Sequence, residues 1–122
     1  MNDPVTNTEF GAQIVWADTE NYKSMILIFK TPGAKLPLHF HKETEKSWFV
    51  NNGKFKIRWI DTKDGNLYEK EMTEGSVFHV EPLTPVELES ETVEASISQV
   101  SNKDSNLDIL QISPENATVS KE

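Results

Sequence analysis

The chain of 122 residues carries 20 acidic and 12 basic side chains, and its formal net charge is −8. Such a chain repels nucleic-acid phosphates and anionic lipids, so we expect neither a nucleic acid nor a membrane as a partner. The absence of cysteine excludes disulfides, thiolate metal ligands and cysteine nucleophiles, and the length fits a single domain over residues 1–122.

The two ends of the chain are polar. Residues 1–8 and 113–122 contain few large apolar side chains, which predicts flexible ends. The first residues lack the basic and apolar stretches of a secretion signal, and no apolar run approaches the ~18 residues of a membrane span. These features predict an unprocessed cytoplasmic protein.

Between the ends, apolar and polar side chains alternate with the period of two that is typical of strands. In Lys54–Ile60, for example, Phe55, Ile57 and Trp59 share one face, and the basic residues share the opposite, solvated face. The pattern predicts ten strands, in chain order Gln13–Ala17, Tyr22–Lys30, Lys35–His41, Lys46–Asn51, Lys54–Ile60, Leu67–Met72, Ser76–Val80, Val86–Ser90, Val93–Val100 and Leu107–Ile112.

Turn chemistry separates these strands. Asn51-Asn52-Gly53 and Lys63-Asp64-Gly65-Asn66 both tolerate a positive φ and favour tight hairpins. Short strands, frequent turns and the lack of an amphipathic helix predict an all-β sandwich or barrel.

The segment His39-Phe40-His41 is the first candidate functional site. Alternate residues of a strand share a face, so the two imidazoles lie about 6–7 Å apart along the chain. That arrangement suits two positions on one divalent metal such as Fe, Mn, Ni or Zn.

Two segments resemble the paired motifs of the cupin superfamily. Gly33, His39, His41 and Gly53 follow the spacing of the first motif, and Gly75–Val86 is similar to the second. The resemblance is strongest to small single-domain cupins like those of mannose-phosphate isomerase and sugar-nucleotide metabolism. It implies a double-stranded β-helix, or jelly roll, with a pocket at one open end, and a homodimer.

The resemblance also implies two further metal ligands, and the chain departs from both positions. Lys46 stands where the family's glutamate is expected, and Val86 stands where its fourth ligand, a histidine, is expected. Glu45 is one residue too early, so on a regular strand its carboxylate points away from the pocket, although a β-bulge would bring it back. The expected cofactor is therefore none, or a divalent metal weakly held by His39, His41 and Glu45.

Lys46 and Trp48 share the inward face of their strand. Lys46 has two readings, a contact to an anion or sugar hydroxyl or a strand-end lysine that reaches solvent. Trp48 is either a pocket wall or a core residue. His79 alternates with the inward Phe78 and Val80, which predicts a histidine on the surface or facing a dimer partner.

The leading functional hypothesis is a small cupin that binds a small polar, sugar-derived metabolite through His39, His41, Lys46 and Trp48. A neutral imidazole with its ordinary pKa would allow general-base chemistry of the isomerase or epimerase kind. One alternative is a metal-dependent oxygenase or isomerase that uses His39, His41 and a bulged Glu45. Another is a non-catalytic binding or assembly module.

The run Met25–Phe29 bears on the predicted homodimer. It is apolar on both faces of its strand. One face then belongs to the core, and the other belongs either to a dimer interface or to a second covering layer.

Overall fold

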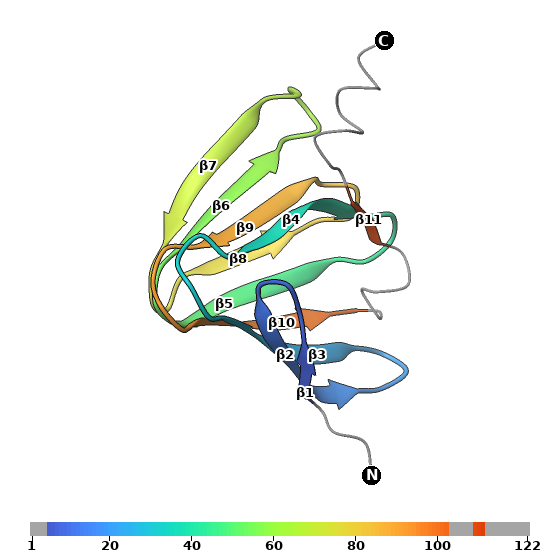
Figure 1. The fold of residues 1–122 in the computed structure, drawn as a ribbon. Coiled ribbons are helices and arrows are strands. Elements are labelled where there is room, and N and C mark those ends of the chain that lie inside the picture. Colours follow the sequence, from blue (N-terminus) through green and yellow to red (C-terminus); the bar gives the residue numbers. More distant parts are fainter. Residues whose placement is uncertain (1–4, 103–108, 112–122) are drawn as a thin grey trace.

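The computed structural model describes residues 5–102 and 109–111, which form strands, turns and no helix (Figure 1). The strands are β1 (Val5–Asn7), β2 (Gly11–Asp18), β3 (Lys23–Phe29), β4 (Lys35–His41), β5 (Lys46–Asn52), β6 (Phe55–Ile60), β7 (Leu67–Met72), β8 (Val77–Val80), β9 (Val86–Ser90), β10 (Ala95–Ser101) and β11 (Ile109–Gln111).

The strands form two antiparallel sheets that face each other as a β-sandwich (Figure 1). The six-stranded sheet has the order β1-β2-β3-β10-β5-β8, and the five-stranded sheet has the order β11-β4-β9-β6-β7. Consecutive strands often lie in different sheets, as β4 and β5 do, which is the arrangement of a jelly roll. The all-β jelly-roll prediction is confirmed.

Each of the ten predicted strands overlaps one observed strand, with small differences at the ends. β1 is the strand that the sequence pattern missed, because Val5–Asn7 lies in a predicted flexible end. It pairs with β2 through backbone hydrogen bonds, and all three of its side chains are exposed, so no hydrophobic alternation marks it. The predicted flexible end at 113–122 lies outside the described residues.

The core fills the space between the inner faces of the two sheets. Phe29 stacks on Phe10 with ring centroids 4.4 Å apart and meets Phe55 edge to face at 5.1 Å. Trp48 and Ile57 are fully buried in the same cluster. The alternation of β5 and β6 is therefore realised as predicted, with the apolar face of each strand turned inward.

The basic face of β6 carries ion pairs on the outside of the five-stranded sheet. Arg58 donates hydrogen bonds to Glu87 at 2.6 Å and to Glu89 at 2.9 Å on β9, and to Glu69 at 2.9 Å on β7. These carboxylates raise the pKa of Arg58 above its ordinary value. The hydrogen bond that Arg58 donates to Glu89 has the largest effect. The basic residues lie on the outer face, as predicted, and the structure adds their pairing with acidic residues of β7 and β9.

The connections at one end of the sandwich position the candidate site. β4 ends at His41, β5 begins at Lys46, and β8 ends at Val80, so the β4–β5 and β8–β9 connections meet at this end. The backbone N–H of Leu83 donates to the carbonyl of His41 at 2.7 Å, which ties the two connections together.

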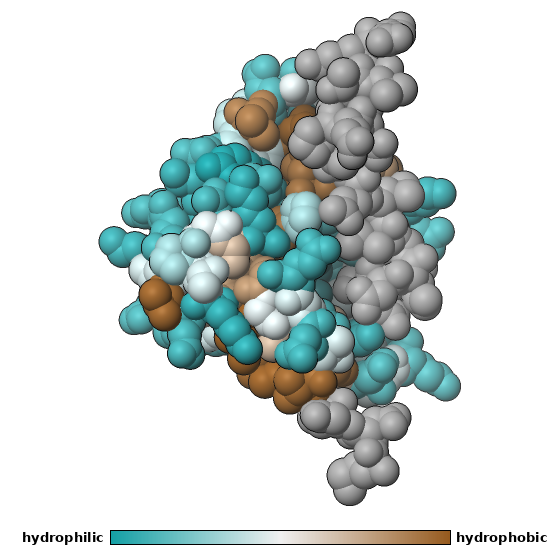
Figure 2. All heavy atoms as spheres, in the orientation of Figure 1, coloured by the Kyte–Doolittle hydropathy of each residue, from teal (hydrophilic) through white to brown (hydrophobic). Residues whose placement is uncertain are grey.

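The surface in view in Figure 2 is mostly hydrophilic, with hydrophobic side chains gathered at its lower edge near β1–β3. Among the residues that the structure describes, no helix is long and apolar enough to cross a membrane.

Candidate functional site

His39 and His41 both face the interior of the sandwich, as the period of two predicts. Their side chains are buried, with 1% and 2% of the residue surface exposed. The ring centroids are 5.3 Å apart and the rings are nearly perpendicular. The two imidazoles therefore form one buried group near the end of β4.

The ammonium of Lys46 lies between the two imidazoles. Its Nζ is 2.7 Å from Nε2 of His39 and 3.1 Å from Nε2 of His41. Lys46 is 3% exposed, so the reading of a strand-end lysine in solvent is wrong. The reason is the alternation of side chains along β5. Lys46, its first residue, shares the inward face with Trp48 and Val50, and its side chain points toward β4.

The hydrogen bonds of His39 determine its tautomer. Its Nδ1 donates to the carbonyl of Pro37 at 2.7 Å, because a carbonyl oxygen only accepts. Nε2 is then left as the acceptor for the Lys46 ammonium. Burial, followed by the positive charge of Lys46, lowers the pKa of His39 to about 3. The expectation of an imidazole with its ordinary pKa is therefore wrong for His39.

Trp48 belongs to both the core and the site. Its ring is fully buried, and the Nζ of Lys46 lies 4.8 Å from the ring centroid, within the range of a cation–π contact. Its indole N–H donates to Oε1 of Gln99 at 2.7 Å. Gln99 is a site residue that the sequence reasoning missed, although a polar residue at an inward position of β10, alternating with Ile97, was an available signal.

Val86 lies beside the two histidines. It is the Cα partner of His39 in the β4–β9 pairing and is completely buried. Position 86, where the family resemblance implies a histidine ligand, is thus next to the imidazole of His39.

Glu45 does not reach the interior group. β5 pairs with β8 in regular register from Lys46 onward, with no bulge there to turn Glu45 inward. Its carboxylate accepts from Nε2 of His79 at 3.2 Å on the outside, and the Glu45 side chain is 47% exposed. The predicted ligand set of His39, His41 and Glu45 is therefore corrected: the first two lie together, and the third lies elsewhere.

The interior group does not fit a divalent metal ion. The two Nε2 atoms that would bind the ion converge instead on an ammonium, which repels a cation at that point and cannot act as a ligand while protonated. In the described ranges 5–102 and 109–111, three side chains have metal-ligating atoms within 4.8 Å of one another. They are Glu45, His79 and Glu81, and the interior histidines are not among them.

His79 lies on the outer surface, as the alternation predicts, with its side chain 50% exposed. It borders a cleft of about 240 Å³ that is also lined by Tyr22, Lys46, Ser47 and Asn102. The cleft lies at the same end of the sandwich as the interior histidines.

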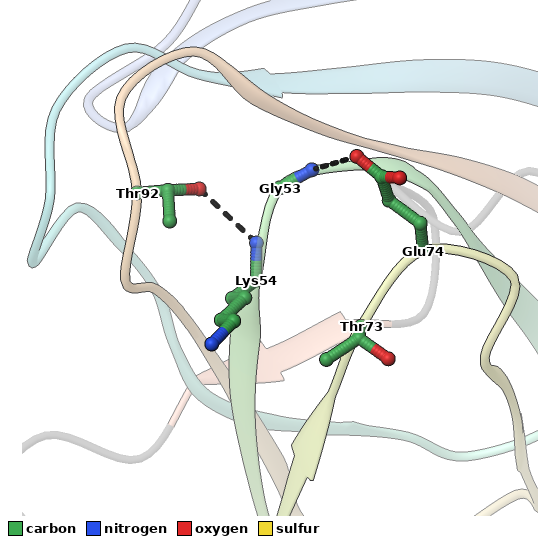
Figure 3. Close-up of a pocket in the computed structure, with 5 residues that line it drawn as sticks. All are labelled: Gly53, Lys54, Thr73, Glu74 and Thr92. Atoms are coloured by element: carbon green, nitrogen blue, oxygen red, sulfur yellow. Dashed lines mark hydrogen bonds between the residues drawn. The ribbon is translucent and has the colours of Figure 1, made fainter.

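A larger hollow, of about 520 Å³, lies at the opposite end, where the β5–β6, β7–β8 and β9–β10 turns meet (Figure 3). Lys54 donates its backbone N–H to the hydroxyl of Thr92 at 3.1 Å, and Gly53 donates to Glu74 at 3.4 Å. These bonds join the turns to one another. The hollow is shallow and its lining residues are mostly exposed, so it is a weaker candidate than the histidine end.

The chain was compared with known proteins. Its sequence matches the model of a family described as Cupin over residues 2–116. No curated protein matches it.

Solved structures share its fold. Oxalate decarboxylase from Bacillus subtilis is 20% identical, with a TM-score of 0.78 over 96% of this chain and 33% of that chain. The capsular polysaccharide assembling protein CapF from Staphylococcus aureus is 18% identical, with a TM-score of 0.78 over 88% of this chain and 33% of that chain. The chain thus spans about a third of the length of each, and the likeness shows the fold alone.

Proposed function

This chain belongs to the cupin family, and on that premise we propose that it binds a small polar, sugar-derived metabolite at the histidine end of the sandwich, without a metal between the histidines. The observation that carries the proposal is the Lys46 ammonium, 2.7 Å and 3.1 Å from the two imidazole Nε2 atoms. In its protonated form, this amine recruits an anion or a hydroxyl oxygen instead of a divalent cation.

The residues behind Lys46 hold its side chain in place. Trp48 and Gln99 are buried and hydrogen-bonded to each other, so they support the lysine and do not themselves touch a ligand. In the proposal, the Lys46 ammonium, which borders the cleft, donates to ligand oxygens. The cleft bordered by Lys46 and Ser47 is the proposed route from solvent.

The proposal concerns binding and assigns no reaction. A pKa of about 3 keeps the His39 imidazole neutral but makes it a weak base near pH 7. This argues against His39 as the residue that takes a proton in the isomerase or epimerase role. The metal-dependent alternative required Glu45 beside the histidines, and that carboxylate pairs with His79 instead.

The names of two structural neighbours mention small polar compounds or their polymers. One is named for oxalate, and one for the assembly of a capsular polysaccharide. At 20% and 18% identity these names do not transfer to this chain. The ligand class proposed here depends on Lys46 and the two imidazoles.

The test is a ligand panel read by thermal shift and by the histidine ring signals in NMR. The panel contains neutral hexoses, hexose phosphates, uronic acids and amino acids. We expect sugar acids or sugar phosphates to raise the Tm of the wild type and of Lys42→Met, an exposed lysine nearby, but not of Lys46→Met. Circular dichroism checks that each variant folds. A panel without any binder, or a shift that survives in Lys46→Met, would contradict the proposal.

A further inference from the structure

We propose that Glu45, His79 and Glu81 form a second site, on the outside of the sandwich, that binds one divalent transition-metal ion such as Zn²⁺ or Ni²⁺. We call these three residues the rim site. It is separate from the interior histidines, and its existence does not depend on the ligand proposed above.

The spacing of the donor atoms is that of ligands on a single ion. Nε2 of His79 lies 3.2 Å from a carboxylate oxygen of Glu45 and 3.8 Å from one of Glu81. One donor atom from each residue lies within 4.8 Å of the others. A tetrahedral shell with bonds of about 2.0–2.2 Å has edges of about 3.3–3.6 Å, so small side-chain movements are enough to close the shell.

The histidine is already oriented for this role. Its Nδ1 lies 2.8 Å from the hydroxyl of Ser47, and Ser47 is its direct partner in the β5–β8 pairing. Nδ1 is therefore occupied, and Nε2 faces the two carboxylates. A hydroxyl can both donate and accept, so Ser47 can accept the Nδ1 proton when Nε2 gives up its own proton to bind an ion, and that bond keeps the ring in this orientation.

The backbone of Glu45 is held by Asn102, the residue that directly follows β10. The N–H of Glu45 donates to the side chain of Asn102 at 3.1 Å, and the N–H of Asn102 donates back to the Glu45 carbonyl at 3.3 Å. Glu81 directly follows β8, two residues after His79. Two of the three ligands are thus anchored next to hydrogen-bonded strands, which lowers the ordering cost of binding an ion.

The charge and exposure of the rim site suit a divalent ion that stays partly hydrated. Two carboxylates and a neutral imidazole balance a charge of +2, and zinc binds both imidazole nitrogen and carboxylate oxygen. All three side chains are open to water, with exposed fractions of 47%, 50% and 63% for Glu45, His79 and Glu81. Water can therefore fill the remaining coordination positions, and we expect moderate, micromolar affinity rather than a structural site.

The first experiment is calorimetric titration of the untagged full chain with Zn²⁺ and Ni²⁺. We expect one equivalent to bind the wild type, and His79→Gln and Glu45→Gln to weaken binding at least tenfold. Glu43→Gln, which removes a nearby exposed carboxylate outside the rim site, is the matched control and should bind like the wild type. Unchanged affinity in His79→Gln would overturn the proposal.

The second experiment locates the ion. Paramagnetic Cu²⁺, added in small amounts to ¹⁵N-labelled protein, should broaden the amide signals of Ser47, His79 and Glu81 first. Broadening centred on His39 and His41 would instead overturn the proposal in favour of an interior metal. Neither outcome depends on finding the polar ligand, so failure of the rim site is distinguishable from failure of the proposed function.

Discussion

Lys46 lies within hydrogen-bond distance of both imidazoles and within cation–π range of Trp48, so three side chains share one buried positive charge. The side chain takes this position because the first residue of β5 points toward β4. Replacing the lysine with a carboxylate would turn a repulsive centre into a hard oxygen ligand. We therefore expect residue 46 to have a large influence on whether the interior can hold a metal.

We expect Lys46→Glu combined with Val86→His to create a strong interior metal site. The new imidazole is placed well, because residue 86 is the cross-strand partner of His39. Each restored ligand should contribute at least about 1.4 kcal/mol, a factor of ten in affinity. Calorimetry with Mn²⁺, Ni²⁺ and Zn²⁺ measures the gain, in a His79→Gln background that removes the rim site.

The control for this prediction is Glu45→Gln in the same double variant. It should leave the new affinity unchanged, because the Glu45 carboxylate pairs with His79 on the outside. Equal metal affinity before and after the double change would contradict the prediction.

The buried His39 also predicts how stability depends on pH. Its pKa is lowered to about 3 in the folded protein, against an ordinary value of 6.5. As the pH falls, His39 is therefore protonated in the unfolded chain before it is protonated in the folded protein. Its contribution to the free energy of unfolding is complete above pH 6.5 and is lost as the pH falls toward 3. Between pH 7.5 and 5.5 this one group should lower the free energy of unfolding by about 1.4 kcal/mol.

Urea unfolding at these two pH values checks the prediction in the wild type and in His39→Gln, whose amide oxygen can still accept from Lys46. From pH 7.5 to 5.5, the free energy of unfolding should fall by about 1.4 kcal/mol less in the variant than in the wild type. An equal pH dependence in the two proteins would show that His39 is not buried in its neutral form.

At the scale of elements, the β5–β6 turn depends on Gly53. The sequence predicted a tight hairpin here, which is wrong, because β5 and β6 belong to different sheets and the turn crosses from one sheet to the other. The φ of Gly53 is +84°, and a Cβ atom built there would lie 2.5 Å from the hydroxyl of Thr92 and 2.6 Å from the Cβ of Ala95. The turn thus packs closely against the β9–β10 connection. Gly65 in the β6–β7 turn has a similar φ of +74° but no atom within 4 Å of such a Cβ.

This pair separates backbone strain from steric overlap. Gly65→Ala should cost about 1 kcal/mol, the strain of a left-handed alanine. Gly53→Ala adds overpacking and should cost about 2–4 kcal/mol in total. Urea unfolding of both variants measures the difference, and equal losses would show that the β9–β10 connection moves aside freely.

For the whole molecule, the outer face of the six-stranded sheet presents exposed apolar side chains from four strands. They surround a shallow hollow of about 180 Å³, and they are Trp16, Phe49, Val77 and Val100. β3 crosses this region between β2 and β10, and its outward Ile26 and Ile28 are only half-buried. The face of the Met25–Phe29 run that points away from the core thus lies among other apolar side chains of the outer surface.

We expect this face to associate with a second copy of the chain, in agreement with the homodimer expected from the sequence. Light scattering at micromolar concentration should give about twice the 13.9 kDa of one chain. Phe49→Lys should shift the mass toward the monomer, since it places a charge in the apolar face. Leu67→Lys, at an exposed apolar residue of the other sheet, should not. A wild type with the mass of one chain would contradict the prediction.

The sequence by itself determined the all-β fold, most strand positions and the shared face of His39 and His41. Each of these depends on local rules, since the period of a strand places alternate side chains together whatever the rest of the chain does. The same rule placed Lys46 and Trp48 inward, His79 outward and the charges of β6 in solvent. β1 was missed because three exposed residues carry no hydrophobic pattern.

The tertiary structure alone decided which of these side chains meet. Register between strands brings Val86 beside His39, and Gln99 to Trp48 across 51 residues of sequence. The packing of one sheet on the other brings Lys46 of β5 to the two histidines of β4. The tertiary structure also places the carboxylate of Glu45 beside His79, 34 residues away, on the outside of the sandwich. A β-bulge would have turned that carboxylate inward. Alternation specifies a face but not a partner, because the partner depends on how far one strand slides along the next, and hydrogen bonds between distant strands determine that offset.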